Sequence, residues 1–512
     1  MPIALRSVLI SDAVDDACVA LLTSHGVPVT KKYKMSKEEL LQEIKHHDGL
    51  IVRSDTKVTA EVLAAASSLR VVGRAGTGVD NIDLQAATRK GIVVLNTPGG
   101  NSISACEMTC ALITSLARNV AQAAQSLRAG RWDRKLYSGH ELAGKTLAVL
   151  GLGRIGREVA IRMQSYGMRV IGFDPMTSTE AAKEFGVEKM ELEQIWPLAD
   201  YITVHTPLIP QTRNLINATT LAKSKKGVRV INVARGGIVD EEALLDSLKA
   251  GHCGGAALDV FVEEPPKNPA TLELIQHPNV IGTPHLGAST TEAQQRVAVE
   301  IAEQFLAISG RSTAYSVTGI VNAPILTAAL SDVNAAWINL SKKLGQLGGK
   351  FLKKGSGSIS IESQTIGSDM EKKKFVHTAV LVGILAGQTK NGLNLINAPI
   401  LAKDIGVSIK ESHADGENAV AVKVGQHQVK GTVRGANEPL LISIDDAIFS
   451  NGVPLVDNLS LYRGSGPGDL ASIVTALSAK GVQIQSLNSA GKWFAVQTNQ
   501  EITVNVDGVE NF

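Results

Sequence analysis

Four polar residues follow short apolar runs in the middle of the chain: Arg235, Asp259, Glu264 and His285. Taken singly, each has a structural explanation, as a surface cation, a loop acid or a strand-end histidine. Together they supply what oxidation of a 2-hydroxy acid needs. A base takes the hydroxyl proton while hydride leaves the same carbon, and a guanidinium holds the carboxylate in a plane. A carboxylate beside the histidine fixes its tautomer and stabilises the imidazolium.

A glycine-rich segment, Gly151-Leu-Gly153-Arg-Ile-Gly156, lies between the apolar run TLAVL and the helix-forming run REVAIRMQSYG. Gly151 permits a tight turn, Gly153 lets the backbone approach a pyrophosphate, and Gly156 lets the helix pack on the sheet. Asp174 ends the next predicted strand, where a carboxylate accepts the adenosine ribose hydroxyls and repels the 2′-phosphate of NADP. The segment predicts an NAD(H) site, and the alternative is a glycine-rich turn without a ligand.

These residues require strands to position them, and the first 300 residues alternate short β-branched runs with helix-length stretches. Continuous apolar runs of this kind predict βαβ units and parallel sheets buried on both faces. The predicted strands lie at 8–11, 49–54, 70–76, 91–96, 146–153, 168–174, 201–207, 229–235, 255–261 and 280–285. They form two groups, separated by one long apolar helix predicted over Ser102–Arg128. Two such domains predict a cleft between them in which ligands bind.

The pattern changes after the Gly, Ser and Thr residues of 309–321. We expect a helix over 325–353, a strand over 358–363, an amphipathic helix over 371–387 and antiparallel strands over 419–446. The tail from Leu455 predicts a small α+β module. The fold class is α/β: two doubly wound, Rossmann-like parallel-sheet domains, followed by an α+β intervening domain and a C-terminal module. The predicted domains are 1–98 plus 287–308 for substrate, 99–286 for NAD, 309–450 as intervening domain, and 451–512.

Composition excludes several classes of protein. The 512 residues are 44% hydrophobic and 20% charged, which excludes a largely disordered chain, and a net charge of +2 favours neither nucleic acid nor an acidic membrane as partner. No apolar run reaches the roughly 18 residues of a spanning helix. Three aspartates near the N-terminus interrupt what would be the apolar centre of a signal peptide. The four cysteines are dispersed, so we expect neither disulfides nor a metal site, and a cytoplasmic location.

Six segments occur in a familiar order: GRAGTGVDNIDLQAA, NTPGGNS, GLGRIGREVA, VARGGIVDEEAL, ALDVFVEEPP and PHLGAST. On these motifs the chain resembles the NAD-dependent D-2-hydroxyacid dehydrogenases, and within them those that act on 3-phosphoglycerate. The resemblance is strong over residues 5–310 and weaker beyond. It implies oxidation of 3-phospho-D-glycerate to 3-phosphohydroxypyruvate with NAD, the first step of L-serine biosynthesis. It also implies a homo-oligomer, either a dimer through the nucleotide domain or a tetramer.

The resemblance also implies roles for individual residues. Arg235 would clamp the substrate carboxylate, His285 would exchange the proton, and Glu264 would be its partner. Asp259 would accept a hydrogen bond from the nicotinamide carboxamide. The cofactor-binding residues implied are Thr77, Gly151, Gly153, Arg154, Ile155, Gly156, Asp174, Thr206, Val233, Ala234, Arg235, Asp259, His285, Leu286, Gly287 and Ala288.

The 3-phosphate of such a substrate needs cations of its own. Arg53 and Arg74 end successive predicted strands and are the first candidates, with surface ion pairing as the alternative. Arg134 is a third candidate, because in the family a basic loop after the long helix reaches a neighbouring subunit. Asn101 completes the expected substrate-binding residues. The chain departs from the family at Gly99, where an asparagine is usual.

The C-terminal module resembles an ACT domain, a type that binds serine in some bacterial relatives. Only one helix and three or four strands are visible before Phe512, so we expect a truncated module without serine regulation. Two other functions stay open. The first is another D-2-hydroxyacid dehydrogenase, such as a hydroxypyruvate or glyoxylate reductase, but its substrate would leave Arg53 and Arg74 without an anion. The second is a non-catalytic NAD-sensing protein of the corepressor type, for which the long C-terminal extension is unexpected.

Overall fold

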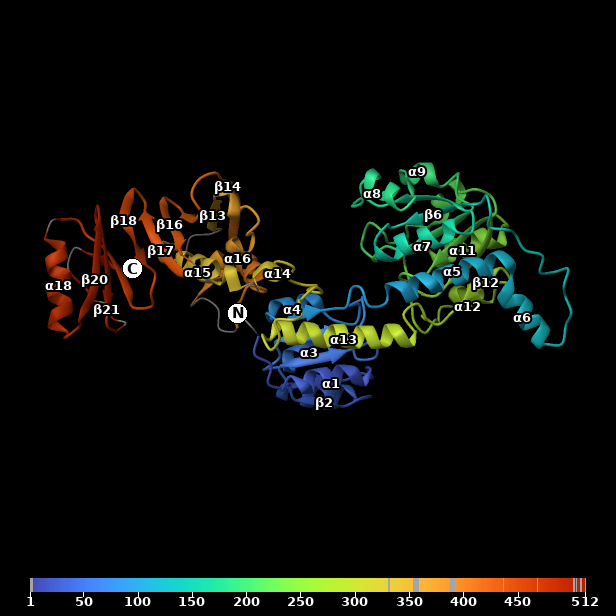
Figure 1. Ribbon diagram of the computed structural model, residues 1–512, viewed down its shortest axis with the longest axis horizontal. Coiled ribbons are helices and arrows are strands. Elements are labelled where there is room, and N and C mark those ends of the chain that lie inside the picture. Colours follow the sequence, from blue (N-terminus) through green and yellow to red (C-terminus); the bar gives the residue numbers. More distant parts are fainter. Residues whose placement is uncertain are drawn as a thin grey trace. The chain divides into compact units, whose positions relative to one another are not determined.

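The computed structural model divides into two compact units, Met1–Asn96 with Ile301–Phe512, and Thr97–Glu300 (Figure 1). Each is described by itself. The predicted domain boundaries and the predicted cleft stay predictions. No helix among the residues described is long and apolar enough to cross a membrane. The structure describes residues 3–329, 332–352, 359–386, 392–435, 437–466, 468–500, 502, 504–506 and 509–511.

The N-terminal part of the first unit is a five-stranded parallel sheet in the order β2-β1-β3-β4-β5. The strands β1, β3 and β5 are fully buried, as expected for a sheet covered by helices on both faces. The half-exposed edge strand β2 was not predicted. The elements are β1 (Val8–Ile10), α1 (Asp16–Ser24), β2 (Val29–Lys31), α2 (Lys37–Glu43), η1 (Ile44–His46), β3 (Gly49–Val52), α3 (Ala60–Ala65), β4 (Val71–Arg74), α4 (Leu84–Arg89) and β5 (Val93–Leu95).

The second unit contains a seven-stranded parallel sheet in the order β12-β11-β10-β9-β6-β7-β8. The chain reverses its direction of winding between β6 and β9, and ligands of such sheets bind outside the strand ends at that point. Its elements are β6 (Thr146–Leu150), α7 (Arg154–Gln164), β7 (Arg169–Phe173), α8 (Thr179–Glu184), β8 (Glu188–Lys189), α9 (Leu192–Ile195), β9 (Tyr201–Val204), α10 (Ala218–Lys223), β10 (Val228–Asn232), α11 (Glu241–Lys249), β11 (Cys253–Leu258), α12 (Pro269–Gln276) and β12 (Val280–Gly282). The helix α13 (Thr291–Ile308) begins in this unit and ends in the first.

The single long helix predicted over Ser102–Arg128 is wrong. The segment forms two helices, α5 (Ser102–Arg118) and α6 (Val120–Arg128), with Asn119 between them in the left-handed conformation at φ 52°. Asparagine tolerates this conformation better than most residues. Its side chain also donates to Ser138 O at 3.3 Å. The break redirects the chain after one apolar helix, which apolar periodicity alone did not reveal.

A second correction concerns the helix predicted as amphipathic over 371–387. The observed helix α16 (Phe375–Leu385) is buried at every residue, so it has no polar face. It packs against α15 in a layer that covers a mixed sheet in the order β14-β13-β15-β16-β17-β18. The elements are α14 (Leu326–Ala329), η2 (Asp332–Asn334), α15 (Ala335–Lys350), β13 (Ile359–Ile366), η3 (Ser368–Met370), α16, α17 (Ala398–Asp404), β14 (Val407–Ala414), β15 (Ala419–Val424), β16 (His427–Arg434), β17 (Glu438–Ile444) and β18 (Ala447–Pro454).

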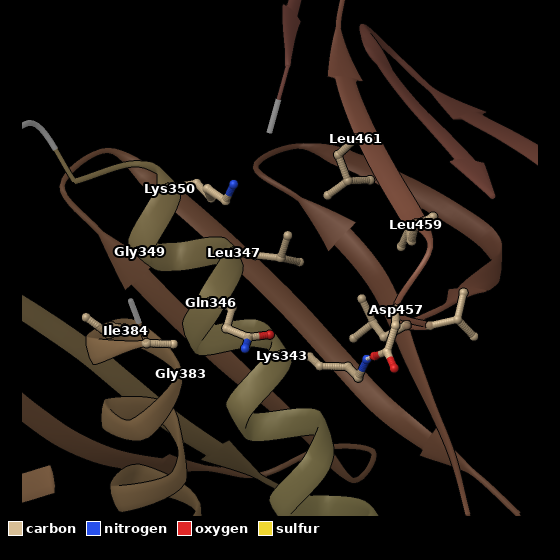
Figure 2. A pocket seen from close by; sticks show the side chains of 13 residues that line it. Lys343, Gln346, Leu347, Gly349, Lys350, Gly383, Ile384, Asp457, Leu459 and Leu461 are labelled. Carbon is tan, nitrogen blue, oxygen red and sulfur yellow. Dashed lines mark hydrogen bonds and ion pairs between the residues drawn. The ribbon is translucent and has the colours of Figure 1, made fainter. Parts of the chain in front are cut away.

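The described residues of the C-terminal module form one helix and an antiparallel sheet in the order β20-β21-β19-β22. A cavity of about 680 Å³ lies where the segment before β19 passes α15 and α16 (Figure 2). At its edge Lys343 Nζ pairs with Asp457 Oδ1 at 2.7 Å, which ties the module to α15. The elements are β19 (Leu459–Arg463), α18 (Asp469–Ala479), β20 (Ile484–Ala490), β21 (Trp493–Thr498) and β22 (Glu510–Asn511).

Candidate active site

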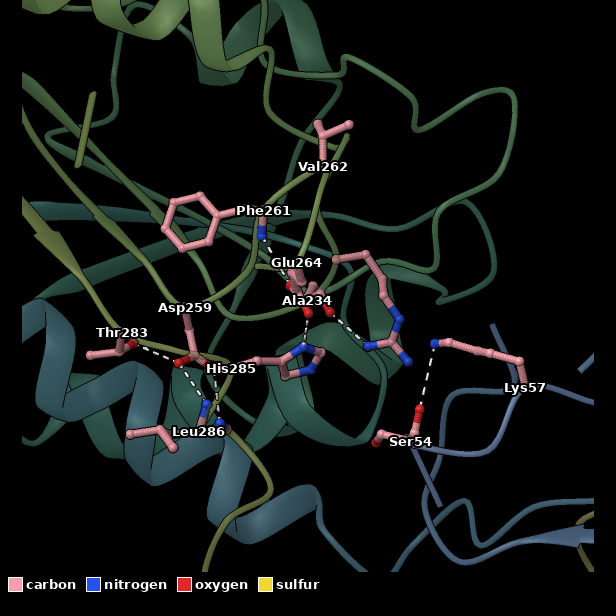
Figure 3. A network of polar contacts seen from close by, with 12 residues as sticks. Ser54, Lys57, Ala234, Asp259, Phe261, Val262, Glu264, Thr283, His285 and Leu286 are labelled. Atoms are coloured by element: carbon pink, nitrogen blue, oxygen red, sulfur yellow. Dashed lines mark hydrogen bonds and ion pairs between the residues drawn. The ribbon is translucent and has the colours of Figure 1, made fainter. Parts of the chain in front are cut away.

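A histidine and a carboxylate meet at the carboxyl ends of β11 and β12. His285 Nδ1 lies 2.6 Å from Glu264 Oε2, and Glu264 Oε1 accepts the Phe261 N–H at 3.1 Å (Figure 3). Burial raises the pKa of Glu264, but the hydrogen bonds from His285 and Phe261 and the nearby positive charges, including Arg235, outweigh it and lower the pKa below its ordinary value. An ionised Glu264 accepts a hydrogen bond from Nδ1–H, which leaves Nε2 of the imidazole for a substrate.

The loop that carries His285 is held in an unusual conformation by Asp259. His285 has a φ of 54°, which non-glycine residues rarely adopt. Its N–H donates to Asp259 O at 2.8 Å. The fully buried Asp259 carboxylate accepts the N–H groups of Leu286 and Gly287, both at 2.8 Å, and the Thr283 hydroxyl at 2.5 Å. Asp259 therefore builds the histidine loop, and its predicted contact with the nicotinamide stays a prediction.

The loop of Arg235 follows β10 and is held by a residue that the motif analysis missed. Asn232, 2% exposed, accepts the Ala234 N–H at 3.0 Å and donates to Arg235 O at 2.8 Å. The Arg235 guanidinium donates to Ala234 O at 2.7 Å. The sequence feature that could have identified Asn232 is its position as a polar residue at the end of the otherwise apolar segment VIN. The arrangement fixes the backbone of Val233–Arg235, where the cofactor was predicted to bind.

The glycine-rich segment has the geometry that a pyrophosphate requires. Gly151 has a φ of 97°, and a Cβ atom at Gly156 would overlap the carbonyl oxygen of Gly151. At Gly153, in contrast, a Cβ atom would meet no atom within 4 Å, so the backbone is open to a ligand. Gly153 is also the N-cap of α7, and no side chain caps that end of the helix. Uncapped N–H groups at a helix N-terminus suit a phosphate.

Two further groups fit a bound dinucleotide. Asp174 follows β7, and its two oxygens accept the N–H groups of Leu152 at 2.8 Å and Met176 at 2.7 Å. Each oxygen keeps a lone pair for a ribose hydroxyl. Thr206 follows β9, and its buried hydroxyl has no hydrogen-bond partner among the residues described. A buried hydroxyl seldom stays unpaired, so a ligand is a natural partner for it.

The second unit thus brings most of the predicted cofactor residues to one edge of its sheet, within the loops that follow β6, β7, β9, β10, β11 and β12. Asn101 precedes α5 in the same unit. At Gly99 a Cβ atom would meet nothing within 4 Å, so the missing asparagine side chain leaves space rather than a clash. Arg134 is exposed on the segment after α6. Its predicted role in binding substrate stays a prediction.

The predicted phosphate ligands lie in the first unit, at the carboxyl ends of β3 and β4. Arg74 donates to Ser54 Oγ at 3.1 Å, and Arg53 precedes that serine. Burial lowers the pKa of Arg53, while the charges of Asp12 and Asp55 raise it. Thr77, a predicted cofactor residue, follows β4, and its carbonyl accepts from Asn96 at 2.6 Å. Arg74 therefore contacts the loop that carries Arg53, and binding of a phosphate by the two arginines stays a prediction.

Comparison with known proteins agrees with this geometry. Residues 110–287 match the NAD-binding domain of the D-isomer specific 2-hydroxyacid dehydrogenases, and residues 334–445 match the D-3-phosphoglycerate dehydrogenase intervening domain. The chain is 49% identical to the human D-3-phosphoglycerate dehydrogenase over 503 residues, which cover 95% of this chain and 92% of that protein. The chain belongs to the D-3-phosphoglycerate dehydrogenase family. The enzyme of the same name from Methanocaldococcus jannaschii is 38% identical, with the same coverage of both chains.

Solved structures extend the comparison to the fold. The D-lactate dehydrogenase of Aquifex aeolicus, complexed with NAD and lactic acid, matches with a TM-score of 0.54 and 26% identity, over 60% of this chain and 98% of that one. The TT0316 protein of Thermus thermophilus matches with a TM-score of 0.56 and 33% identity, over 62% and 99%. The predicted family, fold class and NAD cofactor are confirmed.

Proposed function

We propose that the protein oxidises 3-phospho-D-glycerate to 3-phosphohydroxypyruvate, the entry to L-serine biosynthesis. The observation that carries the proposal is the 2.6 Å contact of His285 with Glu264 at the strand ends of an NAD-binding sheet. The relatives named D-3-phosphoglycerate dehydrogenase support the choice of substrate. NAD, when bound, accepts the hydride from C2 of the substrate.

The chain's own residues handle the proton and the charge. His285 takes the C2 hydroxyl proton at Nε2, because Nδ1 is already engaged by Glu264. The ionised Glu264 then stabilises the imidazolium, as the carboxylate of a catalytic triad does. Arg235 holds the substrate carboxylate, since a planar guanidinium binds it through two parallel hydrogen bonds. In the reverse direction the imidazolium returns the proton to the 2-oxo group.

Arg53 and Arg74 distinguish this substrate from unphosphorylated 2-hydroxy acids. A phosphate dianion offsets the cost of holding a partly buried guanidinium, and burial does lower the pKa of Arg53. A glyoxylate or hydroxypyruvate reductase would have no anion for them. An assay separates these functions: NADH formation measured with 3-phospho-D-glycerate, D-glycerate and D-lactate. Preference for the phosphorylated acid supports the proposal, whereas no turnover of any of the three would leave the NAD-sensing function.

We also propose that the protein is a cytoplasmic homodimer, joined through α6 and the segment after it. Large apolar side chains are exposed there, at 52% for Val120, 58% for Leu127, 81% for Trp132 and 74% for Leu136. Clustered exposed apolar residues are typical of an interface. The four cysteines are free thiols, which fits a reducing compartment. Light scattering tests the interface, since replacing Trp132 and Leu136 by serine should give monomers, and an unchanged dimer would contradict it.

A further inference from the structure

The loop that carries Arg53 is hydrogen-bonded to a buried carboxylate. Asp12 follows β1 and is 4% exposed. Its carboxylate accepts the N–H of Arg53 at 2.6 Å, the N–H of Thr56 at 3.1 Å, and the hydroxyl of Thr56. That hydroxyl also lies 2.9 Å from Ser11 Oγ. The donors are thus drawn from both ends of the four-residue loop that connects β3 to the segment before α3.

The same loop is held at its carbonyl groups by an asparagine. Asn81 Nδ2 donates to Arg53 O and to Thr56 O, both at 2.7 Å. Asn81 lies between β4 and α4, so it reaches the loop from a different element than Asp12 does. Both backbone groups of Arg53 and of Thr56 are therefore bound by two side chains. Within the loop, Ser54 accepts from the guanidinium of Arg74 at 3.1 Å.

Another buried carboxylate of this domain shows what a purely structural role looks like. Asp48 precedes β3, and it is also 4% exposed. It accepts the Arg6 N–H at 2.9 Å and the Arg6 guanidinium at 3.0 Å, which ties two segments at the opposite end of the strand. Asp12 instead holds the loop that carries Arg53 and Ser54, the serine that accepts from Arg74. Its bonds fix the position of Arg53 rather than the packing of the sheet.

We propose that Asp12 and Asn81 are positioning residues that set the enzyme's preference for a phosphorylated substrate, by holding the Arg53–Thr56 loop. The inference rests on the proposed function, in which Arg53 binds the 3-phosphate. Displacement of a binding group by about 1 Å can reduce a rate by about 100-fold. Loosening this loop therefore reduces binding of the phosphate and leaves unphosphorylated acids, which make no such contact, nearly unaffected.

The test measures kcat/KM of the full-length protein for 3-phospho-D-glycerate and for D-glycerate, with the Kd for NADH as a second measurement. The variants are Asp12→Asn, Asn81→Ala and the milder pair Thr56→Val and Thr56→Ser, with Asp48→Asn as the matched control. Asp12→Asn and Asn81→Ala should lower the ratio of the two kcat/KM values by about 10- to 100-fold. Thr56→Val should lower it by about 3- to 10-fold. Thr56→Ser keeps the hydroxyl and should restore it, and NADH binding should not change.

Asp48→Asn should leave the ratio at the wild-type value, even where it lowers the melting temperature. Arg53→Ala, measured in parallel, separates the two hypotheses. A lowered ratio for Arg53→Ala together with a wild-type ratio for Asp12→Asn and Thr56→Val would overturn the positioning role and keep the proposed function. An unchanged ratio for Arg53→Ala would show that Arg53 does not bind the phosphate, and it would overturn the positioning role as well. If Asp12→Asn does not fold, the Thr56 pair decides.

Discussion

The two parallel sheets of this protein differ at the point where the chain reverses its direction of winding. In the first unit the chain reverses between β1 and β3, and Asp12 fills that position by binding the protein's own loop. In the second unit it reverses between β6 and β9, and Gly153 leaves the backbone open to a ligand. Both positions are the expected ligand sites of such sheets. The side chain present there decides whether the edge binds a cofactor or supports a substrate loop.

The comparison extends to the loops that carry the proposed substrate-binding residues. In the second unit Asp259 uses a buried carboxylate to hold the backbone after His285. In the first unit Asp12 does the same for the loop of Arg53. Each sheet thus places one buried carboxylate beside a loop that carries a proposed substrate-binding side chain, His285 or Arg53. What differs is the chemistry proposed for each loop, which is proton transfer by His285 and binding of the phosphate by Arg53.

The largest effect is expected in the second unit. Replacing His285 by alanine removes the proton acceptor, so kcat should fall by about 10²- to 10⁴-fold. NADH binding should largely persist, because the ring handles the proton and contributes little to cofactor affinity. Stopped-flow turnover and NADH fluorescence titration measure the two separately. A residual rate within tenfold of the wild type would remove His285 from the mechanism.

The next effect belongs to the first unit and sharpens the contrast. Changing Arg53 or Arg74 to alanine removes a charge-assisted contact worth about 1.5–3 kcal/mol, or roughly 10- to 150-fold in kcat/KM for 3-phospho-D-glycerate. D-glycerate lacks the phosphate, so its kcat/KM should be nearly unchanged. Equal losses for both substrates would mean that the arginines stabilise the domain instead. The protein would then be a D-2-hydroxyacid dehydrogenase whose substrate is not specified by these arginines.

A smaller effect is expected at the cofactor. Replacing Asp174 by alanine should weaken NAD binding by about tenfold, which corresponds to the loss of a hydrogen bond to a charged group. Discrimination against NADP should relax at the same time, because the carboxylate that repels the 2′-phosphate is gone. The ratio of kcat/KM for NAD to that for NADP measures the change. An unchanged ratio would exclude Asp174 as the ribose ligand.

The smallest effect concerns pH. The pKa of Glu264 is lowered in the folded protein, so any stability it contributes is fully present above its unfolded pKa and is lost as the pH falls through the folded pKa. Glu264→Gln removes the charge that supplies this stability, so its melting temperature should lie below that of the wild type at neutral pH, and the two melting temperatures should converge as the pH falls through the folded pKa of Glu264. A difference between the two proteins that is greater at acid than at neutral pH would contradict the lowered pKa.

Much of this site could be predicted because its residues are local in sequence. The glycine spacing of Gly151–Gly156 and the polar residues after the later strands identify the second sheet directly. The residues that hold the Arg53 loop could not be found this way, since Asp12 and Thr56 are 44 positions apart in the sequence. A single left-handed residue, Asn119, also divides a helix that its apolar pattern predicts to be continuous. The polar residues before α16 likewise led to the prediction of an amphipathic helix, whereas tertiary packing buries every residue of α16.

The central claim is that the protein takes a hydride from C2 of 3-phospho-D-glycerate. In the most direct test, the wild-type protein and NAD are incubated with substrate that carries deuterium at C2, and the mass of the reduced cofactor is measured by mass spectrometry. The account predicts NADH that carries the deuterium, and a much slower transfer from deuterated D-glycerate. No reduced cofactor, or deuterium released to water, would contradict it.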